Sequence, residues 1–189
     1  RDTYASRGLG DVYKRQAISA TKQIRQLSDL LSDSDIRYEF SPEEFTDTSL
    51  EFSIDLCNKV YEAWGKASSS EPIIFNLPAT VERLLPNQYA DMIEIFSKKI
   101  SNRDSIIISL HTHNDQGMAV AATELGLMAG ADRVEGTLFG HGERTGNVDL
   151  VVCINNYFAR GIETGIDLSN LPVIANKVES LTGMPIYYR

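Results

Sequence analysis

Four times along this chain, a short apolar run that predicts a β-strand is followed by a segment with helical periodicity. The predicted strands are Ile36–Phe40, Pro72–Leu77, a strand from Ser105 that carries two histidines, and Arg133–Leu138. The predicted helices are Ala17–Leu31, Thr46–Trp64, Asn87–Ile100, Met118–Met128 and Thr145–Ala159. Because strands that alternate with helices pair in parallel through right-handed crossovers, we expect an α/β fold with a parallel sheet.

Each predicted strand is followed by a loop with polar side chains. These are Glu43, Thr80, the pair His111 and His113, and the pair Glu143 and Asn147. Polar groups at the carboxyl ends of successive parallel strands are what a (β/α)8 TIM barrel uses for its active site. Four strand–helix units are half of such a barrel. A doubly wound sheet is the structural alternative, but no Gly-x-Gly-x-x-Gly loop follows the first strand.

The third predicted strand carries a His-x-His pair. The β-branched run from Ile106 to Ile108 indicates a buried strand. Successive strand side chains point to opposite faces, so His111 and His113 lie on the same side, about 7 Å apart along the backbone, where two imidazoles can converge on one cation. Such a pair is more often structural than metal-binding. Its position at the carboxyl end of a buried strand, beside a second glycine-rich loop, favours a metal site.

The composition limits the classes of partner. The chain has 189 residues, 42% of them hydrophobic and 23% charged, which is ordinary for one globular domain or part of a larger one. A formal charge of −8 argues against nonspecific binding to nucleic acid. No apolar run approaches the roughly 20 residues of a membrane span, and nothing at the start resembles a signal peptide. Two isolated cysteines, Cys57 and Cys153, suit a reducing compartment, so we expect a cytoplasmic protein.

The two ends of the chain differ from the middle. Residues 1–16 have no clear periodicity and no initiator methionine, so the chain starts inside a longer reading frame or its opening residues are foreign to it. We therefore divide the chain into a leading segment (1–16), a partial barrel domain (17–165), and a helix with the start of a linker (166–189).

Four ordered motifs carry a resemblance to a known family. His111-Thr-His-Asn-Asp115 and Gly140-His-Gly-Glu-Arg-Thr-Gly-Asn147 resemble the signatures of the metal-dependent 2-oxoacid condensing enzymes. Asn76-Leu-Pro-Ala-Thr-Val-Glu82 and Tyr38-Glu-Phe-Ser-Pro-Glu43 narrow the resemblance to the 2-isopropylmalate synthases. Homocitrate synthases, citramalate synthases and hydroxymethylglutaryl-CoA lyases share the first two motifs, but the Asn-Leu-Pro-Ala-Thr motif fits them less well.

The resemblance implies the carboxyl-terminal half of a TIM-barrel acyltransferase, which condenses acetyl-CoA with 2-oxoisovalerate in leucine biosynthesis. A divalent metal, Mg, Mn or Zn, holds the oxoacid in that family. The roles implied here are metal binding by His111, His113 and Asn147, substrate binding by Glu43 and Thr80, and catalysis on the acetyl-CoA side by Glu143. The full-length enzymes are expected to be homodimers.

Simpler interpretations exist for most of these residues. Thr80 could cap the following turn, and Glu43 could complement a helix dipole. Glu143 and Arg144 could form a surface ion pair. His141 stands where many relatives of the family carry asparagine, so we do not assign it to the metal and expect it to line the loop.

Other elements of the family are not found. The Arg-Asp-Gly motif of its first strand supplies a further metal ligand, and Arg1-Asp2-Thr3 does not fit that context. The amino-terminal half of the barrel, the later subdomain and the leucine-sensing domain have no counterpart here. We therefore expect this chain alone to bind metal weakly and to have negligible synthase activity. A noncatalytic scaffold fragment is the remaining alternative.

Overall fold

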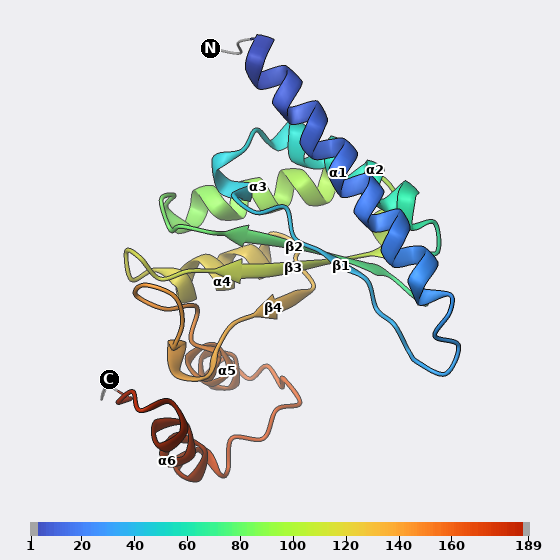
Figure 1. Cartoon of the computed structure of the whole chain (residues 1–189). Helices are drawn as coiled ribbons and strands as arrows, with labels where there is room; N and C mark the ends of the chain where they lie inside the picture. Colours follow the sequence, from blue (N-terminus) through green and yellow to red (C-terminus); the bar gives the residue numbers. More distant parts are fainter. Residues whose placement is uncertain (1–3, 187–189) are drawn as a thin grey trace.

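A computed structural model describes residues 4–186, and its centre is a four-stranded sheet in the order β1-β2-β3-β4 (Figure 1). All three neighbouring pairs are parallel, which confirms the predicted topology. The strands are β1 (Glu39–Phe40), β2 (Ile73–Ala79), β3 (Ile106–Thr112) and β4 (Arg133–Glu135). The α-helices are α1 (Tyr4–Ser28), α2 (Leu50–Trp64), α3 (Pro86–Lys99), α4 (Ala119–Met128), α5 (Leu150–Ala159) and α6 (Leu171–Thr182). Short 3₁₀ turns are η1 (Phe45–Asp47), η2 (Arg103–Ser105) and η3 (Leu138–Gly140).

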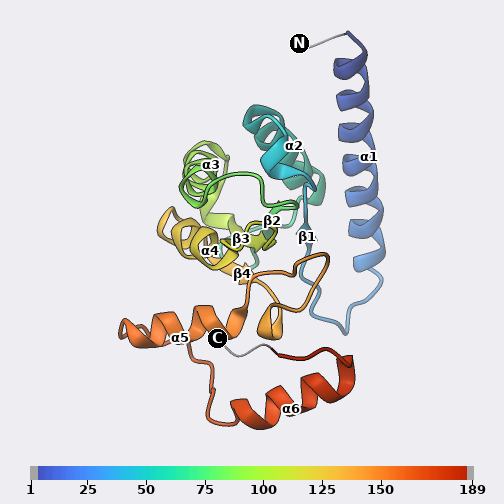
Figure 2. The ribbon, with the colours of Figure 1, turned by 90° about the vertical axis from the view of Figure 1, so that its left-hand side faces the viewer.

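The helices cover one face of a curved sheet. Viewed toward the ends of the strands, α2, α3, α4 and α5 follow one another around its outer side (Figure 2). The α1 helix packs on α2, and α6 lies beyond α5. Such an arc of parallel strands with outer helices is half of a TIM barrel, as expected, and it leaves β1 and β4 as sheet edges. None of the helices between residues 4 and 186 combines the length and apolar content that a bilayer crossing demands.

The outer face of the sheet forms the hydrophobic core. Alternate residues of β2 and β3 point toward the helices and are buried, namely Ile73, Phe75, Leu77, Ile106, Ile108 and Leu110. Phe96 of α3 makes edge-to-face contacts with Phe45 and Phe75, at ring-centroid distances of 5.9 and 6.5 Å. Tyr38 stacks on Trp64 at 4.5 Å and connects the entry to β1 with the end of α2. Burial of these side chains drives the helices onto this face.

Helix starts follow local capping chemistry. Ser49 accepts a hydrogen bond from the Phe52 amide and starts α2. Pro86 occupies the first turn of α3, where its missing N–H costs nothing.

The structure corrects several predicted boundaries. The leading segment, predicted to lack periodicity, is helical from Tyr4, so α1 starts well before Ala17; residues 1–3 lie outside the described range. The first strand is only Glu39–Phe40, because its single neighbour β2 pairs with just these two residues. The fourth strand ends at Glu135, and the chain then enters η3.

The predicted helix Thr145–Ala159 begins later, at Leu150. Thr145 lies in a turn instead, and a return segment follows, in which Asn147 pairs with His113 and Asp149 with Thr137. Asp149 then caps α5 by accepting hydrogen bonds from the amides of Val151 and Val152. Tertiary pairing therefore overrides helical periodicity in this segment.

Candidate metal and substrate site

The two histidines of the His-x-His pair converge at the carboxyl end of β3. His111 is in the strand, and His113 follows its end, paired with Asn147. Their Nε2 atoms are 3.3 Å apart and their ring centroids 5.2 Å apart. The rings therefore lie on the same side of the sheet, as strand alternation predicts.

Asn147 joins this pair from the neighbouring loop. Its Nδ2 atom lies 3.1 Å from Nε2 of His111. The close approach depends on glycine, since a Cβ at Gly142 would lie 1.7 Å from Oδ1 of Asn147. Gly146 has a φ of +109°, and a Cβ there would lie 2.0 Å from the carbonyl oxygen of Gly140. The glycines of this loop thus allow Asn147 to reach His111.

Arg144, to which sequence reasoning gave no role at the site, connects three loops. It donates from Nε to Asp115 at 2.7 Å and from Nη2 to the Thr80 carbonyl at 2.7 Å. Nη2 also lies 2.6 Å from Nδ1 of His113, which must accept this hydrogen bond. The bond from Arg144 lowers the pKa of Asp115 to about 2. Burial, followed by the electrostatic effects of His111 and Arg144, lowers the pKa of His113. Because Nδ1 accepts from Arg144 it carries no proton, so the ring is neutral.

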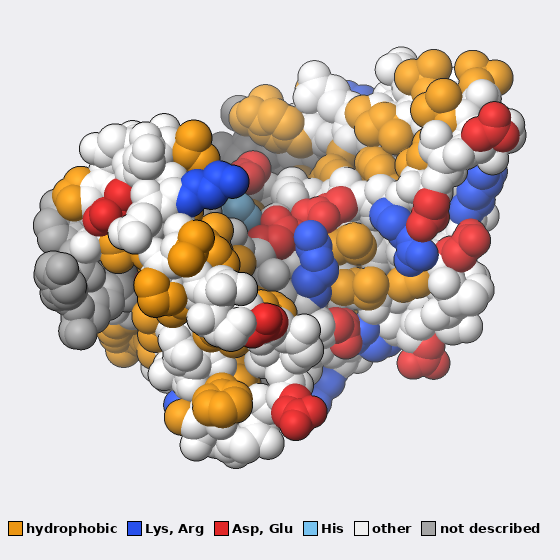
Figure 3. All heavy atoms as spheres, turned by 90° about the horizontal axis from the view of Figure 1, so that it is seen from below, with side chains coloured by type: hydrophobic (Ala, Val, Ile, Leu, Met, Phe, Trp, Pro, Cys, Tyr) orange, Lys and Arg blue, Asp and Glu red, His pale blue; other side chains and the backbone are white. Residues whose placement is uncertain are grey.

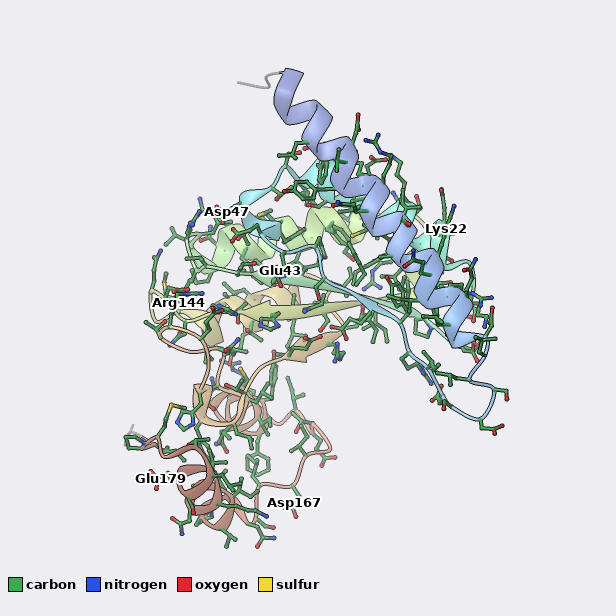
Figure 4. The ribbon with its side chains drawn as sticks, in the orientation of Figure 1. Lys22, Glu43, Asp47, Arg144, Asp167 and Glu179 are labelled. Atoms are coloured by element: carbon green, nitrogen blue, oxygen red, sulfur yellow. The ribbon has the colours of Figure 1, made fainter. Side chains whose placement is uncertain are left out.

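The two predicted substrate residues contact each other. The Thr80 hydroxyl donates to Oε2 of Glu43 at 2.9 Å and accepts a hydrogen bond of 2.9 Å from the Glu44 amide. Thr80 therefore ties the loop after β2 to the loop after β1. Glu43 and Arg144 lie at the same end of the sheet (Figure 4).

Two other predicted residues lie at the periphery. The Glu143 side chain is 75% exposed and its carboxylate is 3.5 Å from Nη1 of Arg144, the surface ion pair considered as the simpler interpretation. His141 lines a cavity of about 710 Å³ between the Gly140–Asn147 loop and Met184–Ile186. Its Nδ1 atom is buried and has no hydrogen-bond partner among the described residues. His141 thus lines the loop, as expected.

Glu82, the last residue of the Asn-Leu-Pro-Ala-Thr-Val-Glu motif, has a supporting role that the sequence did not reveal. It is only 4% exposed, and its carboxylate accepts hydrogen bonds from the amides of Gln116 and Met118 at the start of α4. Its own amide donates to Asp115 at 3.0 Å. Glu82 therefore stabilises the segment that follows the histidines.

The inner face of the sheet is polar and charged. Seen from below, acidic and basic side chains and a histidine gather around a hollow (Figure 3). Ser109 and Asn76 donate to Glu135 at 3.0 and 3.1 Å, and Arg133 contacts both Glu135 and Glu39. Burial and the neighbouring Glu135 raise the pKa of Glu39. Burial also raises the pKa of Glu135, but hydrogen bonds from Glu39 and Ser109 and the charge of Arg133 outweigh it, so that this pKa lies below its usual range.

The spacing of the two histidine nitrogens at the carboxyl end of β3 fits a shared cation. Two nitrogen ligands at about 2.1 Å from one ion, at an angle of about 90 to 109°, are about 3.0 to 3.4 Å apart. The 3.3 Å between the Nε2 atoms of His111 and His113 lies in that range and also fits a hydrogen bond. Among residues 4–186, no group of three or more His, Cys, Asp or Glu side chains is arranged to hold a metal ion. A third protein ligand here would be Oδ1 of Asn147, which requires the amide to turn, because its nitrogen is the atom that faces His111.

Comparison with known sequences identifies similar synthases. The chain is 49% identical over 176 residues to a 2-isopropylmalate synthase of Ralstonia nicotianae. This alignment covers 93% of this chain and 30% of that protein. It is 50% identical over 177 residues to a 2-isopropylmalate synthase of Saccharomyces cerevisiae, in an alignment that covers 92% of this chain and 28% of that protein. The chain thus spans less than a third of the length of the curated relatives it matches.

Comparison with solved structures supports the half-barrel fold. The hydroxymethylglutaryl-CoA lyase of Bacillus subtilis aligns with a TM-score of 0.70 at 22% identity, over 91% of this chain and 57% of that one. The hydroxymethylglutaryl-CoA lyase of Brucella melitensis aligns with a TM-score of 0.66 at 19% identity, over 88% of this chain and 59% of that one. The sequence profile described as HMGL-like matches residues 8–178, most of the chain. This chain, with its polar strand ends and outer helices, belongs to the HMGL-like family.

Proposed function

We propose that this chain is the carboxyl-terminal half of the catalytic barrel of a 2-isopropylmalate synthase, which condenses acetyl-CoA with 2-oxoisovalerate. The observation that carries the proposal is the convergence of His111, His113 and Asn147 at the carboxyl end of the sheet. The relatives named as this synthase, at 49 and 50% identity, support the choice of reaction.

The three converging residues would hold a divalent cation. Imidazole nitrogens and an amide oxygen suit Zn, Mn or Mg. When bound, the cation would polarise the keto group of the oxoacid as a Lewis acid. Binding through Nε2 of His113 requires its ring proton on Nδ1, the atom to which Arg144 now donates, so a cation competes with Arg144 for this ring.

The remaining predicted residues would position the substrates. The hydroxyl of Thr80, beside Glu43, would orient the oxoacid carboxylate and so fix the face that is attacked. Glu143, exposed in the Gly140–Asn147 loop, would face acetyl-CoA. The proposal includes these roles. It also includes a homodimer of the full-length enzyme and a cytoplasmic location, although one relative is named as mitochondrial.

Two alternatives differ in chemistry. A related condensing enzyme or lyase would share the histidine pair but act on another substrate. A scaffold fragment would keep the fold without binding a cation. The synthase is favoured because relatives with that name are about twice as identical to this chain as the lyases of known structure.

The experiment replaces the aligned segment of the R. nicotianae synthase with residues 17–178 of this chain and measures condensation of acetyl-CoA with a panel of 2-oxoacids. We expect turnover with a preference for 2-oxoisovalerate, and its loss in the His111→Ala, His113→Ala double variant. A folded chimera that prefers another 2-oxoacid, or that cleaves hydroxymethylglutaryl-CoA, would favour the related enzymes. A folded but inactive chimera beside an active parent would favour the scaffold.

A further inference from the structure

The carboxylate of Glu135, on the inner face of the sheet, lies beside His111 of the candidate metal site. Glu135 is paired with His111 in the register of β3 and β4. Its Oε2 atom lies 3.5 Å from Nδ1 of His111 and also accepts from Asn76 at 3.1 Å. Its other oxygen, Oε1, accepts from Ser109 at 3.0 Å and contacts Arg133. Contacts with three strands therefore hold the carboxylate in one orientation.

The hydrogen bonds on the far side of the histidine pair favour one arrangement of the ring protons. Because Arg144 has no acceptor, Nδ1 of His113 accepts, and its neutral ring carries the proton on Nε2. That proton points at Nε2 of His111, 3.3 Å away, which accepts it when its own ring proton is on Nδ1. Asn147 also places its amide nitrogen 3.1 Å from the same atom. The proton of His111 is therefore on Nδ1, facing Glu135.

We propose that Glu135 is the positioning residue of His111: it keeps the ring proton on Nδ1 and leaves Nε2 bare for the cation. Metal-binding histidines commonly donate their other ring N–H to a carboxylate, which fixes the tautomer and raises ligand basicity. This inference rests on the proposed cation site, but the tautomer of His111 can be measured without a cation.

Two variants of the carboxylates beside Arg133 distinguish orientation of His111 by Glu135 from simple ion pairing with Arg133. In Glu135→Gln, the carbonyl oxygen stays beside Arg133, which can only donate. The Asn76 amide, whose Oδ1 has no partner among the described residues, turns to accept from the new amide nitrogen. The amide nitrogen then replaces Oε2 opposite Nδ1 of His111, where it can only donate, so the ring proton is driven to Nε2. Glu39→Gln is the matched control, because Glu39 also pairs with Arg133, at 3.0 Å, but lies on β1 rather than beside His111 in the register. Its new amide can still donate to Glu135, as Glu39 does.

The experiment uses the full 189-residue chain labelled with ¹⁵N in its three histidines, which is few enough for assignment by single variants. Two-bond ¹H–¹⁵N spectra without metal report the tautomer, and competition with a chelator reports Zn²⁺ affinity. We expect Nδ1–H at His111 in the parent and in E39Q, and Nε2–H in E135Q. The Zn²⁺ affinity of E135Q should fall by about 10- to 100-fold, while that of E39Q should stay within about twofold.

The outcomes distinguish this inference from the proposed function. An E135Q chain with an unchanged His111 tautomer and unchanged Zn²⁺ affinity would overturn the role of Glu135. A parent chain that does not bind Zn²⁺ would overturn the proposed cation site, and the tautomer would still decide whether Glu135 orients His111. Should E135Q not fold, Glu135→Asp keeps the charge beside Arg133 but withdraws the carboxylate from His111, and the same loss of affinity is expected.

Discussion

The two faces of the sheet use the same strands for opposite purposes. On β3, Ile106, Ile108 and Leu110 point outward and are buried under helices, whereas Ser109 and His111 point inward among polar partners. The outer face is held by burial of apolar area, and the inner face by hydrogen bonds and charge. Because successive strand residues point to opposite faces, the residues that stabilise the fold and the residues that form the candidate site alternate along the same strand. Substitutions on one face should leave the property of the other largely intact.

The largest effect is expected on the outer face. Phe96 is fully buried and contacts Phe45 and Phe75 edge to face. Phe96→Ala should lower the free energy of unfolding by about 3–5 kcal/mol through lost burial and a cavity, as measured by urea denaturation. Ile95→Ala, one residue along the same helix at a 40% exposed position, should stay within about 0.5 kcal/mol. Equal losses would mean that the outer face does not hold the fold.

The next effect tests the inner face. The His111→Ala, His113→Ala double variant should lose Zn²⁺ or Mn²⁺ binding by at least about a hundredfold, or about 3 kcal/mol of binding free energy. It should cost less unfolding free energy than Phe96→Ala, because the imidazoles bury little apolar area. Titration calorimetry on the parent and variant chains provides the measurement. Identical heats from both would end the assignment of a cation to this pair.

A smaller effect should follow from the loop glycine beside Asn147. In Gly142→Ala the new methyl group would overlap Oδ1 of Asn147, so the amide must move away from His111. We expect a loss of about tenfold in metal affinity, or about 1.4 kcal/mol, by the same titration. Unfolding free energy should change less than in Phe96→Ala. Unchanged affinity would show that Asn147 contributes nothing to the site.

The smallest effect concerns the thiols on the helix-covered side. Cys57 and Cys153 are 0 and 5% exposed, and burial raises the pKa of both, that of Cys153 to about 12. Neither should react with iodoacetamide at pH 8 in the native chain, and both should react in urea. Since the folded pKa is raised, the contribution of the neutral thiols to stability is complete below about pH 8.5 and declines above it. Rapid native labelling, read by mass spectrometry, would mean that the covered face opens.

Local sequence patterns predicted the elements well where burial was strong. The runs in β2 and β3, and the apolar stripes of α2 and α3, are long enough for periodicity to define them. Prediction was poorer at the ends of the sheet, where β1 has two residues and β4 three, because edge strands pair on one side only. The segment Thr145–Asp149 was predicted as helix because its pairing with residues far back in the chain leaves no local signal.

By itself, the sequence determined the parallel α/β half barrel and the common side of His111 and His113, because both follow from repeats of a few residues. Only the tertiary structure decided which groups face those rings. Glu135 and Asn147 approach His111, and Arg144 approaches His113, across 24, 36 and 31 positions of sequence, respectively. The physical reason is that hydrogen bonds between side chains depend on register and loop conformation to within a fraction of an ångström, and no local pattern of residues contains that information.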